Sequence, residues 1–102
     1  MQIWVGSETV WVYEEVKTNP PGGTPVLSDP TTILLTITDP TGTVKVDGLS
    51  MTKYNSEDGK FEYFYSLPAS PEDGDWEVKV VIVDGTGGTA KTTISKGTFR
   101  VR

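Results

Sequence analysis

Hydrophobic and polar residues alternate with a period of two along most of the chain, which is the pattern of strands with one buried face. The segments that show it are ETVWVYEEV (8–16), TTILLTIT (31–38), KFEYFYSL (60–67), DWEVKVVIV (75–83) and the closing GTFRVR (97–102). Shorter candidates lie at Thr43–Val46 and Leu49–Tyr54. No ten-residue segment carries an apolar stripe at helical spacing, so the pattern predicts an all-β chain.

Turn-forming residues separate these segments. DPTG at Asp39–Gly42 has Pro and Gly at the second and fourth positions of a type I turn. EDGK (57–60) and EDGD (72–75) read as turns, and VDGTGGT (83–89) predicts a glycine-rich hairpin loop. TNPPGGTPVLSDP (18–30) predicts a long polar connection with a short extended piece at Val26–Leu27. Seven to eight short antiparallel strands in 102 residues predict a single immunoglobulin-like β-sandwich domain spanning residues 1–102.

One group of aromatic residues has the parity of a core face. Phe61, Tyr63 and Tyr65 alternate with polar neighbours, and Trp76 has the same parity as Val78 and Val80 on the next strand. We expect these four rings between the two sheets, where each buried ring stabilises the fold by about 2–3 kcal/mol.

A second aromatic group has the opposite parity. Trp11, Tyr13 and Phe64 are predicted to point outward, among the acids Glu14, Glu15 and Glu62. Two interpretations stay open at this point. The three rings form a partner-binding patch, or they are covered by the 18–30 connection or by Trp4.

Five pieces of the sequence together resemble a known family. They are GSETVWV, ILLTITDPTGT, DGKFEYFYSLP, GDWEVKV and GTFRVR. From about Gly6 to Arg102 the chain resembles the Ig-like modules of the macroglobulin-like and bacterial surface-protein type. It is also similar to small Ig-like accessory proteins of tailed-phage virions, which decorate capsids, necks or tails. The paired cysteines of antibody-type domains are absent. The resemblance implies a β-sandwich without catalytic activity that docks on a larger particle.

Composition argues against most chemistry. Without histidine or cysteine, the commonest general base and thiol nucleophile are missing, and zinc is disfavoured. The carboxylates of 57–58 and 72–75 lie in predicted turns, do not follow the spacing of an EF-hand loop, and need no calcium there. We therefore expect no enzyme, no metal and no cofactor.

The overall charge of −5 disfavours nucleic-acid partners, because an acidic chain repels phosphate. No apolar run reaches ~18 residues, so we expect no membrane insertion. The opening MQIWVGSETV lacks the pattern of a signal peptide. If the chain is a whole gene product, ordinary secretion is not expected.

The C-terminal segment has the opposite charge. From residue 85 onward the charged residues are Lys91, Lys96, Arg100 and Arg102, with no acid. A charged edge strand protects against aggregation, and it also suits an acidic partner. Arg100 and Arg102 therefore join Trp11, Tyr13 and Phe64 as candidate partner contacts.

Two functions follow from these observations. The first is a structural accessory module that docks on a protein of a larger assembly, a capsid or tail protein of a phage virion being favoured. The second is an extracellular or cell-surface adhesion module that binds carbohydrate or protein within a bacterial or archaeal multidomain protein.

Overall fold

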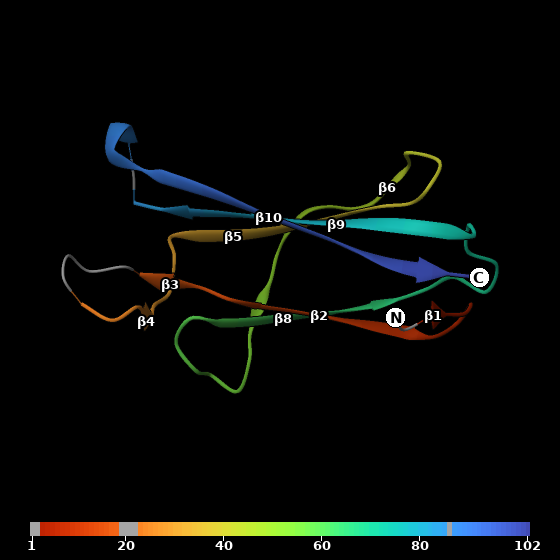
Figure 1. Cartoon of the computed structure of the whole chain (residues 1–102), viewed down its shortest axis with the longest axis horizontal. Coiled ribbons are helices and arrows are strands. Elements are labelled where there is room, and N and C mark those ends of the chain that lie inside the picture. Colours follow the sequence, from red (N-terminus) through yellow and green to blue (C-terminus); the bar gives the residue numbers. More distant parts are fainter. Residues whose placement is uncertain (1–2, 19–22, 86) are drawn as a thin grey trace.

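Two layers of β-strands make up the protein (Figure 1). The structure is a computed structural model that describes residues 3–18, 23–85 and 87–102. The elements, in chain order, are β1 (Ile3–Trp4), β2 (Thr9–Glu15), β3 (Lys17–Thr18), β4 (Val26–Leu27), β5 (Thr32–Thr38), β6 (Val44–Ser50), β7 (Thr52–Lys53), β8 (Lys60–Ser66), β9 (Gly74–Asp84), a 3-10 turn (Gly87–Thr89) and β10 (Lys91–Val101).

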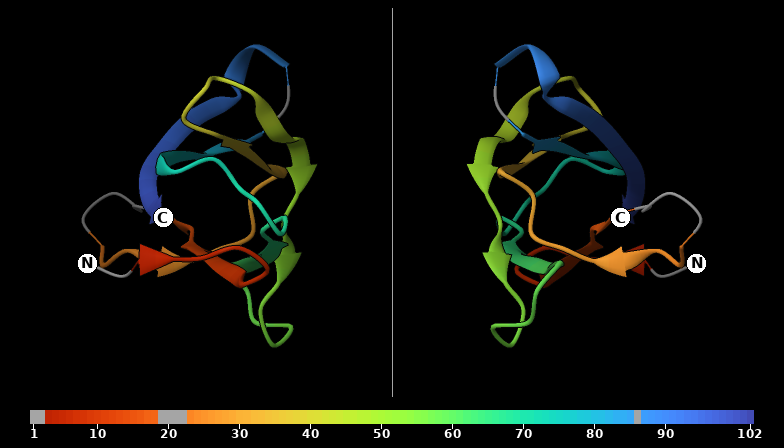
Figure 2. Two further views of the ribbon diagram at one scale, coloured as in Figure 1. Left: turned by 90° about the vertical axis from the view of Figure 1, so that its right-hand side faces the viewer. Right: turned by 90° about the vertical axis from the view of Figure 1, so that its left-hand side faces the viewer.

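The strand order confirms the predicted sandwich. One layer is a five-stranded sheet with the order β1-β10-β9-β5-β6, and the other is a three-stranded sheet with the order β2-β8-β7. A small two-stranded sheet joins β3 to β4. The central order β10-β9-β5 against β2-β8-β7 is that of the immunoglobulin-like sandwich. Seen end-on, the chain crosses from β6 to β7 along one side, and β10 lies on the other (Figure 2).

One strand pair departs from the expected antiparallel arrangement. β1 pairs with β10 in parallel, with Ile3 opposite Arg100 and Trp4 opposite Val101. A strand of only two residues carries no periodicity, so the sequence pattern did not indicate it. The other pairings among the described strands are antiparallel.

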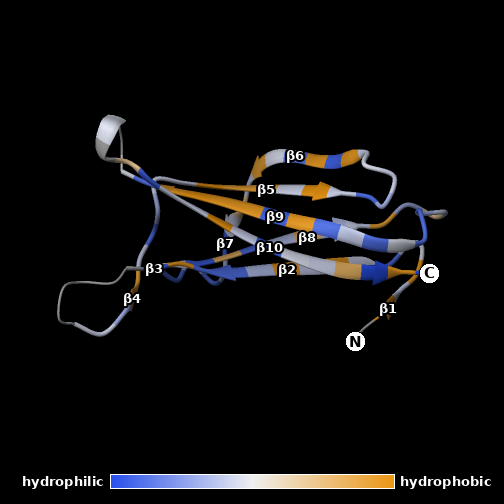
Figure 3. Cartoon of the chain, turned by 45° about the horizontal axis from the view of Figure 1, so that its top comes forward, coloured by the Kyte–Doolittle hydropathy of each residue, from blue (hydrophilic) through white to orange (hydrophobic). Residues whose placement is uncertain are grey.

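The core lies between the two sheets and is centred on Trp76. Trp76 is fully buried, its ring centroid lies 5.6 Å from that of Phe99 and 6.1 Å from that of Tyr65, and its indole N–H donates to the Glu72 carbonyl at 2.9 Å. Figure 3 shows apolar stretches interrupted by polar ones along β9. The other buried apolar residues are Val10, Ile33, Leu35, Ile37, Val46, Met51, Phe61, Leu67, Val80, Ile82 and Val101.

The four predicted core rings differ in burial. Phe61 and Trp76 are buried, as predicted, whereas Tyr63 and Tyr65 are half-buried and pack against the core cluster. This difference fits their chemistry, because a tyrosine hydroxyl is best placed where it reaches water.

Two boundaries differ from the prediction. The short strands predicted at Thr43–Val46 and Leu49–Tyr54 are divided differently, because β6 runs without a break from Val44 to Ser50. Register shifts near Ile37 and a positive φ of 60° at Gly48 accompany this longer strand. β10 begins at Lys91, well before the predicted start at Gly97. Its first half, KTTISK, has little apolar alternation, although it pairs with β9 throughout.

Asp39 anchors the predicted turn between β5 and β6. Gly42 N–H donates to the Asp39 carbonyl at 3.0 Å, which closes the turn. The buried Asp39 carboxylate accepts from the Thr41 hydroxyl at 2.6 Å and from the N–H groups of Thr41 and Thr43, both at 2.9 Å. The Thr41 hydroxyl bond, helped by the two N–H groups and by Lys45, lowers the pKa of Asp39 below its ordinary value of 3.8.

The substitution Trp76→Ala tests the centre of the core. It removes the largest buried side chain, and the expected loss of unfolding free energy is about 3–5 kcal/mol. Phe64→Ala is the control, because Phe64 is 60% exposed and its loss is expected to cost about 1 kcal/mol or less. Urea denaturation followed by circular dichroism measures both. Similar losses for the two variants would contradict the described core.

The substitution Asp39→Asn tests the turn through its pH dependence. Because the folded pKa of Asp39 is lowered, the carboxylate stabilises the fold at neutral pH, and this contribution is lost as the pH falls through the folded pKa. Asp39→Asn should lower the urea midpoint at pH 7, and the difference from the wild type should shrink below about pH 4. A difference that is the same at pH 7 and pH 2.5 would show that Asp39 has no such role.

Candidate functional site

Three of the predicted contact residues lie together on the outer side of the three-stranded sheet. Trp11 on β2 is the cross-strand partner of Phe64 on β8, and their side chains are 47% and 60% exposed. Tyr13, two residues further along β2, is half-buried. We call the surface of Trp11, Tyr13, Tyr54 and Phe64 the aromatic face.

Tyr54 completes the aromatic face and was missed in the sequence. It follows β7, and its ring centroid lies 5.4 Å from that of Tyr13 and 6.1 Å from that of Trp11. The centroids of Trp11 and Tyr13 are 5.2 Å apart. Tyr54 stands at the end of a short predicted strand to which the sequence analysis assigned no inner and outer face, and the pairing of β7 with β8 brings it beside the rings of β2.

Acidic side chains satisfy the polar atoms of these rings. The Trp11 indole N–H donates to Glu62 Oε1 at 2.9 Å, and the Tyr13 hydroxyl donates to Glu15 Oε2 at 2.9 Å. Desolvation, together with the Glu15 hydrogen bond and nearby negative charge, raises the pKa of Tyr13 to about 12. The phenol therefore stays protonated, and the apolar ring surfaces are what the aromatic face offers a partner.

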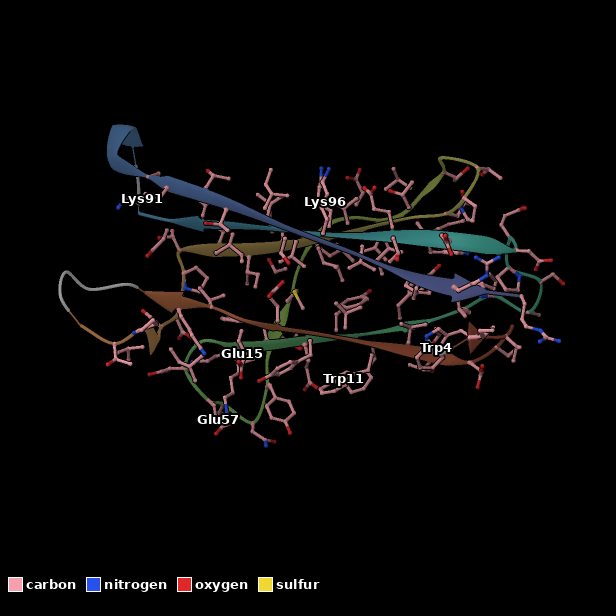
Figure 4. All side chains as sticks on the ribbon, viewed as in Figure 1. Trp4, Trp11, Glu15, Glu57, Lys91 and Lys96 are labelled. Atoms are coloured by element: carbon pink, nitrogen blue, oxygen red, sulfur yellow. The ribbon has the colours of Figure 1, made fainter. Side chains whose placement is uncertain are left out.

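The alternative that Trp4 covers these rings is wrong. Trp4 packs against the core cluster, on the inner side of the sandwich. In Figure 4, the Trp11 side chain projects from β2 away from the five-stranded sheet. Trp11 and Phe64 keep about half of their surface or more in solvent. In the described part of the 18–30 connection, Asp29 bonds instead to Lys53 at 2.7 Å and to the Gly59 N–H at 2.8 Å.

Arg100 and Arg102 lie elsewhere, at the C-terminal end of the five-stranded sheet. Both are exposed, and Arg100 Nη1 donates to Asp75 Oδ1 at 3.2 Å. β1 pairs with β10 at this point, so this end of β10 is not the free sheet edge that the sequence suggested. The structure therefore brings the three aromatic candidates together and places the two arginines on the other sheet.

The outer side of the five-stranded sheet carries a second surface that the sequence analysis did not single out. Ile94, Val81 and Leu34 are cross-strand partners in one row, and Ile94 is 55% exposed. In the neighbouring row Lys96 is directly opposite Lys79. The alternation placed Leu34 and Val81 outward, but only the register of three strands puts them side by side.

The described residues contain no cluster of three or more histidine, cysteine or acidic side chains that is placed to hold a metal ion. Among the same residues, no helix has the length and apolar character needed to cross a membrane.

Comparison of the chain with protein-family models, curated proteins and solved structures finds no match.

The double substitution Arg100→Glu/Arg102→Glu tests the basic end of β10. Both side chains are exposed, and an exposed ion pair such as Arg100–Asp75 contributes little to stability. We expect an unchanged circular dichroism spectrum and a urea midpoint close to that of the wild type. If this end of β10 meets an acidic partner, the same variant should lose docking at low salt. Full docking by the folded variant would remove both arginines from the interface.

Proposed function

We propose that the protein is a non-catalytic docking module that binds a protein of a larger assembly through the aromatic face. The observation that carries the proposal is the solvent exposure of Trp11 and Phe64 side by side on one outer sheet surface. An exposed aromatic pair has a cost in water that a partner removes by covering it.

The residue types favour a protein interface. Tryptophan and tyrosine are enriched among the residues that dominate binding energy, and they act best when a rim of polar residues excludes water. Glu15 and Glu62 supply such a rim, and both already bond to the rings of the aromatic face. A partner therefore gains apolar contact without leaving the indole N–H or the phenol unpaired.

Carbohydrate binding is the second candidate, because an exposed Trp11 ring next to Glu62 offers a sugar both a stacking surface and an acceptor. The ring orientations favour protein. The planes of Trp11 and Tyr13 are inclined by 33°, those of Trp11 and Tyr54 by 48°, and those of Tyr13 and Tyr54 by 80°. A flat sugar chain does not stack on all three rings at once, whereas protein side chains pack into an uneven surface.

A tailed-phage particle is the assembly that the resemblance favours, with a capsid or tail protein as the partner and the virion as the location. An extracellular or cell-surface adhesion module is the alternative. What supports the first is the sequence pattern from GSETVWV to GTFRVR, together with the sandwich that the pattern predicts.

The test expresses each variant in the phage or cell that encodes the chain. It then compares how much of each variant is incorporated into the purified virions or cell-surface fraction. Trp11→Ala and Phe64→Ala should each weaken docking by about 2 kcal/mol if they are central contacts, which is roughly 30-fold. Quantitative mass spectrometry of purified particles measures the copy number of each variant.

Ile94→Ala is the matched control, because Ile94 is exposed to a similar extent on the other sheet. Its incorporation should equal that of the wild type. Loss of incorporation by Ile94→Ala with normal incorporation of the aromatic variants would move the interface to the five-stranded sheet. Strong binding on a glycan array that Trp11→Ala abolishes would favour the adhesion module instead.

A further inference from the structure

A groove runs into the sandwich between β2 and β10. Its volume is about 290 Å³, and its apolar lining includes Val12, Val78, Val80 and Phe99. β2 ends the three-stranded sheet on this side, and within the described residues β10 has a neighbour here only at Arg100 and Val101. The groove therefore lies between two strand edges that are open along most of their length.

Among the residues that the structure describes, the open edge of β2 has no strand partner for its backbone groups. At the ends of β2, Leu67 N–H donates to the Glu8 carbonyl at 2.8 Å, and Val16 N–H donates to the Gly59 carbonyl at 2.7 Å. Alternate residues of a paired strand bond to its neighbour, and the residues between them face the other way. The backbone groups that face the groove side therefore belong to Thr9, Trp11, Tyr13 and Glu15.

The open edge of β10 follows the same rule. Arg102 N–H donates to the Trp4 carbonyl at 3.1 Å, so the backbone groups of the even-numbered residues of β10 point toward the side on which β1 lies. We call the space along this edge of β10, which β1 fills in part, the slot. Beyond β1, this slot is bordered by the backbone of Ile94 and Lys96. β1 itself shows that the slot accepts a parallel strand, with Trp4 inside against the core and Ile3 outside.

The inner side of β10 leaves room for the side chains of an added strand. The inward positions before Phe99 are Gly97 and Ser95, which are both small and line the groove. A Cβ atom built on Gly97 has no neighbour within 4 Å. The apolar surfaces of Val12 and Val78, both half-buried, therefore lack partners on the β10 side.

On the outer face of the sheet, next to the same edge of β10, two lysine side chains lie close together without an acidic partner among the described residues. Lys96 is directly opposite Lys79, and no ion pair of the described residues involves either of them. Like charges opposite each other on neighbouring strands are destabilising. If a further strand were added beside β10, its residue opposite Lys96 would extend the Lys96–Lys79 row on the outer face. A carboxylate at that position would offset the repulsion between the two lysines.

We propose that the groove binds an extended segment of a partner protein, which adds to β10 as a parallel strand in line with β1. The segment has an acidic residue opposite Lys96 and apolar residues at the two flanking positions, which enter the groove over Ser95 and Gly97. Backbone hydrogen bonds to the open edge give affinity, and the alternating side chains give register. Trp11 and Tyr13 line the groove as well as belonging to the aromatic face, whereas Tyr54 and Phe64 belong to the aromatic face alone. Phe64→Ala therefore changes the aromatic face without changing the groove.

In the test, the full chain is titrated with the acetylated, amidated peptide Thr-Val-Glu-Val-Thr up to about 1 mM. Binding is followed through the backbone amide NMR signals of the protein. Shifts and slowed amide exchange are expected at Ile94, Lys96 and Thr98. Gly97→Leu fills the groove from inside and should weaken binding about tenfold or more. Thr92→Leu is the control, because it places the same side chain on the outer face of β10 at a position that does not line the groove. Both variants should keep the dispersed spectrum of a folded protein.

A charge exchange supplies a second readout that does not depend on filling the groove. Lys96→Glu should weaken binding of the glutamate peptide about fivefold, and the peptide with lysine in place of glutamate should restore it. Absence of shifts, shifts confined to the β6 edge, or equal binding by Gly97→Leu would overturn the proposal. Self-association of the peptide-free protein that protects the same β10 amides would also overturn it, because a second copy would then fill the slot.

Discussion

One apolar layer lies buried between two unequal sheets, and its burial decides which way the strand side chains point. Trp76 is its centre, stacked on Phe99 from the five-stranded sheet and close to Tyr65 from the three-stranded sheet. Because strand side chains alternate, fixing Trp76 inward also fixes which residues of β8, β9 and β10 face solvent. The outward positions of Phe64 and Lys96 are consequences of this register.

Side-chain alternation explains why most of the fold was predictable. Val10, Ile33, Val80 and Val101 lie in long segments with a clear period, and all four are buried. The pairing of β1 was not predictable, because two residues carry no period and their parallel partner is nearly a hundred positions away. The first half of β10 was missed for a related reason, since threonine and lysine fit an exposed strand and a loop equally well.

The candidate sites depend on information of a different kind. Trp11, Tyr13 and Phe64 were placed outward correctly, because parity within one strand is enough for that. Tyr54 joins them only through the pairing of two strands. The row from Ile94 to Leu34 and the open edges beside the groove require the order of the strands within each sheet. A sequence pattern indicates which face a residue occupies, but it does not indicate which strand lacks a neighbour.

Hydrogen exchange of the three tryptophan indole N–H groups shows whether the two sheets enclose a dry core. Each gives its own NMR signal, and they occupy different environments, with Trp76 fully buried, Trp11 47% exposed and Trp4 half-buried at the end of the core. If the two sheets enclose Trp76, its indole exchanges only through global unfolding, whereas Trp11 exchanges rapidly from the folded state. Equally fast exchange of Trp76 and Trp11 would contradict the sandwich described here.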